Sequence, residues 1–396
     1  MSNKSVSRLI IFAVIIVIAF LLWPYFTQVN LPHVNMSSFG AGTVPARVTQ
    51  IIEDGEIDLG GTVQRYQIAR VELLEGEYRG IVMEMDYGKR QILSNAVYLR
   101  TGDTVLVTVG SRPDGVLTVY FVDFVRANSL LWLTIIFVAV ILAISRWKGL
   151  RSLLSLGFSL LVIIGYIIPH ILAGEEPLQV SIIGSVILLG VTLYLTYGWN
   201  LKTHAAVVSM IFVLLITGTL AGLFVFFTRL TGAGDENALF LIQMLNTQIN
   251  LRGLLLGGMI IGALGVLDDL VTTQASAVFE LHHANESLEF RALFQSAMRI
   301  GQDHVAATVN TLVLAYAGAA LPMLLMFSLG RSNYGFLVNF EVIAEEIVRT
   351  LVGSLGLVTA VPLTTAIAIL FVLRADSLGK WKQVLGPEGS GDAHIH

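Results

Sequence analysis

The sequence predicts an α-helical polytopic membrane protein with about eight transmembrane helices. A small extracytoplasmic all-β domain, barrel-like and of the OB or SH3 type, is expected between helices 1 and 2. Hydrophobic residues make up 55% of the 396-residue chain and charged residues only 13%, roughly half the charged share of a soluble protein. Eight apolar runs are each near or above the roughly 20 residues that a spanning helix needs. Residues 40–126 instead alternate polar with apolar side chains and are richer in charged residues than the rest of the chain.

The first apolar run, residues 9–26, follows Lys4 and Arg8 and ends in aromatic residues. Aromatic side chains favour the membrane interface, and no small-residue cleavage site follows the run. We therefore expect residues 1–28 to be an uncleaved N-terminal transmembrane anchor whose first residues are cytoplasmic.

Residues 40–126 show the period-two alternation of strands that bury one face. Glycine-containing pairs such as Gly60-Gly61 and Asp114-Gly115 separate the alternating segments and are typical of hairpin turns. About five short strands over roughly eighty residues suit a small closed barrel. We expect the charged residues of this domain to form its solvated face.

Seven further apolar runs predict a helical domain over residues 127–374. They span residues 128–146, 151–171, 178–198, 204–228, 253–279, 304–328 and 347–373. Residues 280–302, between the fifth and sixth of these runs, are expected to form an amphipathic helix on the membrane surface.

The placement of charge predicts the topology. With a cytoplasmic N-terminus and eight helices, the basic residues Arg146 to Arg151, Lys202 and Arg374 to Lys382 all fall inside, as the positive-inside rule requires. The chain is then a multi-pass protein of the cell membrane with both termini cytoplasmic and the β domain outside. Residues 375–396 are expected to be a disordered cytoplasmic tail.

The most chemically distinctive segment follows the glycine-laced run at residues 253–267, where Asp268 and Asp269 stand in tandem. On a helix, spacings of four, three, four and three place residues on one face, and these spacings join Asp269, Thr273, Ser276, Glu280 and His283. Carboxylates and hydroxyls on one face suit protons or small cations. If the helix instead ends at Leu267, the two aspartates only cap it at the headgroups, and this alternative stays open.

The next helices add polar and helix-breaking residues. Asp303 and Asn310 share one face of the sixth run, with Thr311 beside them. Pro362 removes a backbone donor inside the last run and frees a carbonyl, as in the discontinuous helices of transporters. Glu345 and Arg349 are spaced as an ion pair.

Together these residues predict an ion-binding centre between three helices, in which Asp269 and Asp303 approach each other. The candidate ion- or proton-binding residues are Asp268, Asp269, Thr273, Ser276, Glu280, Asp303, Asn310 and Thr311. The candidate helix-breaking or packing residues are Gly262, Gly265, Gly353, Gly356 and Pro362.

Three blocks in the last third of the chain resemble the signature blocks of the YibE/F-like family of bacterial membrane proteins. They read GALGVLDDLVTTQASAVFEL at residues 262–281, GQDHVAATVNTLVLAYAGAALP at residues 301–322, and EEIVRTLVGSLGLVTAVPLTT at residues 345–365. The anchor, the β domain and the LxxGDxVxV pattern that begins at Leu99 are also similar to family members.

The resemblance implies which residues correspond to the family pattern. These are Asp269, Thr273, Ser276 and Glu280 in the first block, Asp303, Asn310, Thr311 and Tyr316 in the second, and Glu346, Gly353, Gly356 and Pro362 in the third. Asp268 departs from the pattern, in which an apolar residue precedes the aspartate. The resemblance brings no assigned biochemical activity.

A secondary transporter or permease coupled to protons or small cations is the function that these patterns favour. The alternative is an accessory or assembly protein whose β domain binds an envelope protein partner. The glycine-rich helix also allows a homo-oligomer. The net charge of −4 gives no basic surface for nucleic acid, so the lipid bilayer is the expected environment.

We expect no enzyme, cofactor or metal. Gly232 to Asp235 spell GxGD, a sequence of intramembrane aspartyl proteases, but the topology separates Asp235 from Asp268 and Asp269. His282 and His283 lack an obvious third metal ligand, and no cysteine is present.

Overall fold

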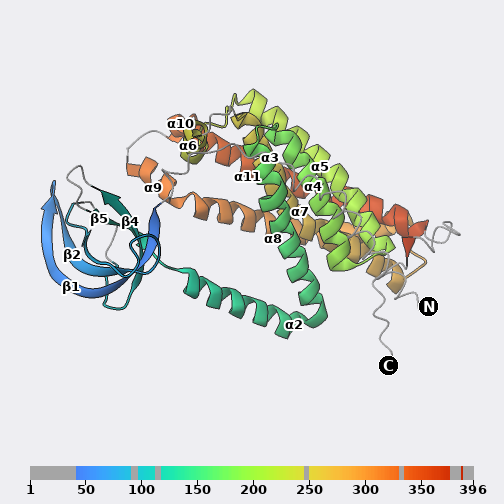
Figure 1. Ribbon diagram of the computed structural model, residues 1–396. Coiled ribbons are helices and arrows are strands. Elements are labelled where there is room, and N and C mark those ends of the chain that lie inside the picture. Colours follow the sequence, from blue (N-terminus) through green and yellow to red (C-terminus); the bar gives the residue numbers. More distant parts are fainter. Residues whose placement is uncertain are drawn as a thin grey trace. The chain divides into compact units, whose positions relative to one another are not determined.

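The computed structural model describes residues 42–90, 97–111, 117–244, 249–329, 334–374 and 385–386. The chain divides into two compact units, His33–Ile144 and Ser145–His396 with Met1–Pro32 (Figure 1). The predicted anchor at residues 1–28, the Asp114-Gly115 turn and all of the predicted tail except Leu385 and Gly386 lie outside the described residues.

A five-stranded closed barrel is the core of the first unit, which confirms the predicted small β domain. Its strands are β1 (Thr43–Leu59), β2 (Thr62–Leu73), β3 (Val82–Tyr87), β4 (Thr104–Ser111) and β5 (Leu117–Phe124). Their order is β1-β2-β3-β5-β4, with β1 pairing back to β4. β3 and β5 are parallel and the other pairs are antiparallel. Of the two predicted barrel types, this order is that of the OB type.

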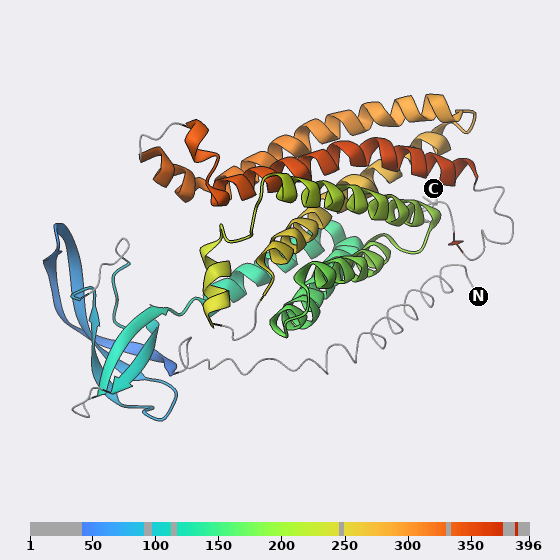
Figure 2. The ribbon, with the colours of Figure 1, turned by 90° about the horizontal axis from the view of Figure 1, so that it is seen from above.

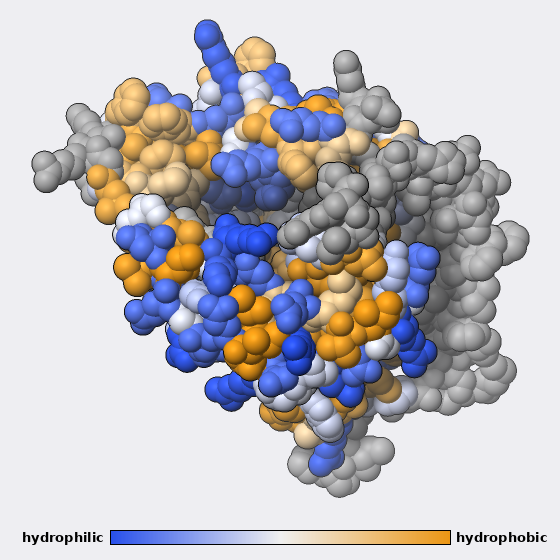
Figure 3. All heavy atoms as spheres, turned by 60° about the vertical axis from the view of Figure 1, so that its left-hand side comes forward, coloured by the Kyte–Doolittle hydropathy of each residue, from blue (hydrophilic) through white to orange (hydrophobic). Residues whose placement is uncertain are grey.

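The period-two pattern decides which side chains fill the barrel. Ala69, Val71 and Leu73 are buried along β2, and Val105 and Val107 along β4. Hydrophilic and hydrophobic residues lie side by side on the face that Figure 3 presents. The alternation therefore separates a packed interior from a mixed outer surface.

The hairpin between β1 and β2 turns at the predicted glycine pair. Gly60 and Gly61 have φ of 69° and 92°, which a two-residue turn of this kind requires and glycine adopts without strain. The Asp58 side chain accepts a hydrogen bond of 2.7 Å from the Gly61 amide.

The helices are long and apolar. They are α2 (Ala127–Val162), α3 (Ile168–Leu172), α4 (Pro177–Tyr197), α5 (Leu201–Phe227), α6 (Glu236–Met244), α7 (Leu251–Ala284), α8 (Phe290–Ala319), α9 (Leu321–Leu329), α10 (Tyr334–Leu337) and α11 (Glu341–Leu373), with a π-helical turn at Ile163–Ile167. Pro169 follows this turn and cannot donate to the helix ladder, which accounts for the wider local winding. α2 breaks at Arg146 (φ 45°), at the predicted boundary between residues 128–146 and 151–171.

The described residues contain five helices that are long and apolar enough to cross a membrane. A sixth is present if α8 and α9, which are bent by 62°, count as one span. The predicted runs 128–146 and 151–171 fall within one of these candidates, Ala127–Leu172, and residues 9–26 lie outside the described part. The other five predicted runs each correspond to one candidate.

The predicted surface helix at residues 280–302 is not a separate element. α7 ends at Ala284, and α8 runs without interruption from Phe290 to Ala319. Gly301 stands near the predicted boundary but lies inside the continuous helix, packed against α7 and α11, so the amphipathic segment continues into the apolar run.

α11 lies at the centre of the helical unit. It packs against α5, α7 and α8, while α7 also contacts α4 and α5. Figure 2 shows α5, α11 and α8 running side by side. The buried side chains at the centre include Met210, Leu267, Phe279 and Leu357. This packing brings together the three segments that hold the predicted site residues.

Candidate functional site

α7 carries the tandem aspartates near its middle. The helix spans 34 residues and continues for 15 residues beyond Asp269, so the alternative in which it ends at Leu267 is wrong. At 1.5 Å per residue, both aspartates lie more than roughly 20 Å from either helix end. Neither side chain caps a helix, and each lies on the flank of a long apolar element.

Asp269 and Thr273 face α8 and meet His304. The Asp269 Oδ2 lies 4.0 Å from the His304 Nε2, and the Thr273 Oγ1 lies 3.3 Å from the His304 Nδ1. The side chain of Asp269 is 74% exposed and that of His304 is 34% exposed. One imidazole therefore contacts a carboxylate and a hydroxyl from two successive turns of the neighbouring helix.

The predicted approach of Asp269 to Asp303 is replaced by this contact with the next residue along α8. Asp303 is exposed and makes no hydrogen bond or ion pair within the described part of the chain. A shift of one residue on a helix rotates a side chain by about 100°, which turns His304 toward α7 and Asp303 away from it. His304 was not among the predicted ion-binding residues, because the adjacent Asp303 already matched the expected carboxylate pattern.

The remaining candidates lie along the same two helices without meeting one another. Glu280 is exposed, and the Ser276 hydroxyl donates to the Thr272 carbonyl at 2.8 Å. Asn310 is exposed on α8, and the exposed Thr311 donates to the Ala307 carbonyl at 3.0 Å. These residues add polar atoms to the outer flank of α7 and α8.

Asp268 lies on a different flank of α7 from Asp269. Its side chain is partly buried, and the carbonyl of Asp268 accepts from the Thr272 hydroxyl, which also lies 3.2 Å from the Tyr197 hydroxyl of α4. The two tandem carboxylates thus belong to different surroundings, Asp269 beside α8 and Asp268 toward the end of α4.

A buried polar junction joins α7, α8 and α11, and it was not among the predicted residues. Gln274 is only 2% exposed. Its Nε2 donates to the Ala297 carbonyl at 3.0 Å and to the Thr365 Oγ1 at 2.7 Å. Gly301 lies against the same amide, since a Cβ there would be 2.7 Å from the Gln274 Oε1. The sequence offered one signal for this junction. It was a glutamine that stands among apolar residues and next to a helix rich in small side chains.

The candidate packing glycines differ in what surrounds them. A Cβ on Gly356 would lie 2.6 Å from the Thr217 Oγ1, so α5 and α11 approach closely there. At Gly262 and Gly353 a Cβ would make ordinary contacts of 3.6 Å, and at Gly265 it would meet open space. Pro362 lies inside α11, which continues unbroken on both sides of it.

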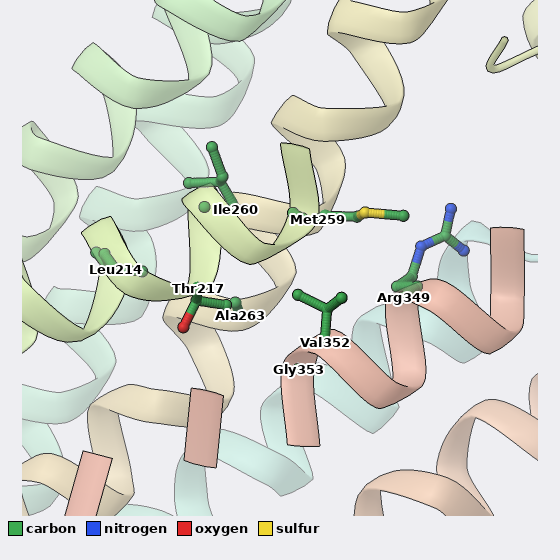
Figure 4. Close-up of a pocket in the computed structure, with 10 residues that line it drawn as sticks. Leu214, Thr217, Met259, Ile260, Ala263, Arg349, Val352 and Gly353 are labelled. Atoms are coloured by element: carbon green, nitrogen blue, oxygen red, sulfur yellow. The ribbon is translucent and has the colours of Figure 1, made fainter. Parts of the chain in front are cut away.

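A small cavity lies between α5, α7 and α11 (Figure 4). Its volume of about 10 Å³ is roughly that of a single water molecule. Thr217, Met259 and Val352 are among the residues that line it, and Arg349 lies at its edge. The cavity is too small to hold an organic substrate.

Arg349 does not pair with Glu345, contrary to the expected ion pair. Its Nη1 contacts the Glu346 Oε1, three residues away on α11. Glu345 is 4% exposed and instead accepts a hydrogen bond of 3.3 Å from the Gly234 amide. The observed ion pair differs from the expected one because the Glu345 side chain faces the loop before α6 and not Arg349.

The GxGD loop binds carboxylates with its backbone. Glu341 Oε1 accepts from the Thr231 hydroxyl at 2.7 Å, from the Gly232 amide at 2.9 Å and from the Thr231 amide. Gly232 also lies against the first residue of α7, because a Cβ there would be 2.3 Å from the Leu251 carbonyl oxygen.

The position of the GxGD loop beside the first residue of α7 can be compared with what an intramembrane aspartyl protease would need. Seventeen residues of α7, roughly 25 Å of helix, separate Leu251 from Asp268. Asp235, which follows the loop, accepts a 2.8 Å hydrogen bond from the Asn237 amide. A proton-sharing dyad needs two carboxylates in contact, and this separation does not provide one.

In the part of the chain that the structure describes, no three His, Asp or Glu side chains are placed so that they could hold a metal ion together. His282 and His283 are in the last turn of α7.

Comparison with known proteins identifies the helical unit. The YibE/F-like protein family matches residues 133–374, more than half of the chain. The match includes Asp269, His304 and all three of the signature blocks, and it leaves out the barrel. No curated protein and no solved structure matches the chain. The chain belongs to the YibE/F-like protein family.

Proposed function

We propose that the protein is a secondary transporter or permease of the cell membrane, coupled to protons or small cations. The contact of Asp269 and Thr273 with His304 is the observation that carries the proposal. Ionisable side chains within transmembrane segments are costly and are generally functional. Here two of them meet between neighbouring helices of an otherwise apolar unit.

The chemistry of this group suits the movement of a proton. Imidazole is the side chain whose charge changes nearest neutral pH. The Asp269 carboxylate lies 4.0 Å from its Nε2, and the Thr273 hydroxyl contacts the other ring nitrogen. Asp269, Thr273 and His304 thus place a carboxylate, a hydroxyl and an imidazole together, which are groups that bind protons or small cations.

The polar flank supplies the environment that such exchange needs. Thr308 and Thr311 continue along α8 from His304, and Ser276 and Glu280 continue along α7 from Thr273. We propose that these residues line a hydrated route along the two helices. Eight spans, cytoplasmic termini and an extracytoplasmic barrel complete the proposal, supported by the distribution of basic residues.

The proposal is tested by ion flux into proteoliposomes. The purified full chain is reconstituted, a pH gradient or a cation gradient is imposed, and internal pH is followed with a trapped dye. Asp269→Asn and His304→Gln should each abolish most of the protein-dependent flux. Glu286→Gln, an exposed carboxylate in the loop between α7 and α8, is the matched control and should retain it. Flux that is unchanged in both site variants would rule the proposal out.

A second function is favoured by one feature of the barrel. Strands β1 and β2 pair with each other as far as Leu59 and Thr62. In the described residues, β1 pairs with β4 only through Arg47, and β2 pairs with β3 only from Gln67 onward. In the described part of the chain, a two-stranded ribbon thus extends past the strand ladders with β3 and β4, and strand edges outside a ladder can bind another chain.

The accessory role makes a different prediction. A variant in which residues 56–65 are replaced by Asn-Gly should lose any partner that a cysteine at the exposed Ile52 of β1 crosslinks in intact cells. The same variant should keep full ion flux if the transporter proposal is correct. If the variant loses the partner and the unmodified chain carries no ion flux, the accessory role is favoured.

A further inference from the structure

An open cavity of about 640 Å³ lies where α5 ends and α7 begins. Its volume is within the range of sites for small organic ligands. The residues that line it are Phe226, Phe227, Arg229, Leu230, Thr231 and Arg252. Two cationic side chains, one from the turn after α5 and one from the first turn of α7, therefore share one cavity with three large apolar side chains.

Neither arginine has a carboxylate partner within the described residues. Arg252 Nη2 donates to the Val225 carbonyl at 3.3 Å, and its other donors remain available. Arg229 makes no side-chain hydrogen bond or ion pair there. The nearby Glu341 carboxylate is engaged by the Thr231 and Gly232 donors. The side chains that line the cavity thus include two cationic groups and no carboxylate, and an anion could pair with both arginines.

The backbone at Arg229 adopts a conformation that is unusual for arginine. Arg229 has φ of 55°, the left-handed conformation that glycine usually provides directly after a helix. The amides of Leu230 and Arg229 donate to the Val225 and Phe226 carbonyls, which is the standard pattern of such a helix end. Glycine would fit this backbone with less strain, so the arginine side chain can be removed by a glycine substitution that suits the local backbone.

The apolar wall and the helix end fit an amphiphilic anion. Phe226 and Phe227 are 65% and 71% exposed, beside the two guanidinium groups. Arg252 is in the first turn of α7, where the helix dipole favours negative charge. Guanidinium groups bind phosphate with paired, charge-assisted hydrogen bonds. Both helices are candidate spans, and the ends of spans lie at the level of lipid headgroups.

We propose that this cavity is a phospholipid-binding site. Arg229 and Arg252 bind the phosphate of an anionic headgroup, and Phe226 and Phe227 contact the first part of its acyl chains. The site lies at the first turn of α7, whereas Asp269 lies near the middle of that helix. The bound lipid would hold α5 against α7.

The test measures binding of defined probes to the detergent-purified full chain. The probes are a short-chain phosphatidylglycerol, the matching diacylglycerol without phosphate, and inorganic phosphate, with bound probe counted by native mass spectrometry. Arg229→Gly is the main variant, because the backbone at this position prefers glycine and folding should be preserved. It should raise the Kd for phosphatidylglycerol about tenfold, and the double variant Arg229→Gln/Arg252→Gln, which removes both guanidinium groups, should raise it further.

The control is Arg291→Gln/Arg299→Gln, which removes two exposed charges of α8 and should leave the Kd unchanged. Phe226→Ser/Phe227→Ser should weaken phosphatidylglycerol but not inorganic phosphate. The proposal is overturned if both arginine variants bind phosphatidylglycerol as the unmodified chain does. It is equally overturned if inorganic phosphate binds as tightly as the lipid and the phenylalanine variant has no effect, since the site would then serve free phosphate.

Discussion

The Gln274 side chain of α7 donates to the hydroxyl of Thr365 on α11 at 2.7 Å, and the same nitrogen donates to the Ala297 carbonyl of α8. One amide thereby joins the three helices that hold the signature blocks. Thr365 in turn donates to the Val361 carbonyl at 2.7 Å. The junction is buried, so its hydrogen bonds have no water to replace them.

Replacing this amide should loosen the helical unit. Gln274→Leu removes both interhelical hydrogen bonds, including the second donor to the Ala297 carbonyl, at a cost of about 1–2 kcal/mol. The measurement is the apparent Tm of the purified protein in detergent. Gln302→Leu, on the exposed side of α8, is the control and should not lower the Tm.

The close approach of α5 and α11 should make Gly356 sensitive to any side chain. Gly356→Ala places a methyl group against Thr217 and should destabilise the unit by about 1–3 kcal/mol. Gly265→Ala, whose methyl group meets open space, should leave stability unchanged or slightly raised. Comparison of the two Tm values checks this, and Thr217→Ala combined with Gly356→Ala should recover part of the loss. Equal Tm values for the two alanine variants would contradict the packing.

The loop at residues 231–234 should depend on the Glu341 carboxylate. Glu341→Ala removes the acceptor of the Thr231 and Gly232 amides, so these amides should exchange hydrogen faster. Hydrogen–deuterium exchange of the peptide that covers the loop measures the change. Glu236→Gln is the control, since this side chain is exposed at the start of α6. Protection of the loop that survives in Glu341→Ala would show that the carboxylate is not what orders it.

The barrel should lose stability in acid through Glu53. The hydrogen bond from the Tyr66 hydroxyl, and then that from Lys89, holds the pKa of Glu53 below its ordinary value of 4.5. A carboxyl whose pKa is lower in the folded state binds fewer protons there than when unfolded. Its stabilising effect is therefore present above pH 4.5 and declines as the pH falls below that value.

This pH dependence can be assigned to the residue. The protection of β1 and β2 in the full chain, taken as the hydrogen–deuterium exchange rate relative to the intrinsic rate of an unfolded chain at the same pH, should fall between pH 5 and pH 3, and Glu53→Gln should flatten that fall. Glu84→Gln is the control, because its carboxylate is largely exposed and lies 3.8 Å from the Arg70 guanidinium. An unaltered pH profile in Glu53→Gln would place the acid sensitivity elsewhere, for example at the Asp54–Arg65 ion pair.

The hydrophobic pattern was sufficient for the elements but not for their contacts. The alternation in residues 40–126 predicted the barrel, and the apolar runs predicted the helical unit, because the period of apolar residues depends on local geometry. The pattern at residues 128–146 and 151–171 also located the break at Arg146. It could not decide whether residues 280–302 form a separate helix, since that depends on where the chain turns.

The site shows the same division. Spacing alone predicted that Asp269, Thr273, Ser276 and Glu280 share a flank of one helix, because the helical repeat is a property of the chain itself. Which residue of α8 meets that flank depends on the rotation of α8 about its axis, and packing sets this rotation. His304 rather than Asp303 therefore faces Asp269.

The sequence by itself determined the membrane character, the β domain, the family resemblance and the polar flank of α7, since composition and periodicity are sufficient for each. Only the tertiary structure decided the partners across helices: Gln274 with Thr365, Glu345 with Gly234, and Arg229 beside Arg252. Those pairs lie 23 to 111 residues apart in the chain. Contacts over such separations arise from the packing of whole helices, which no local spacing encodes.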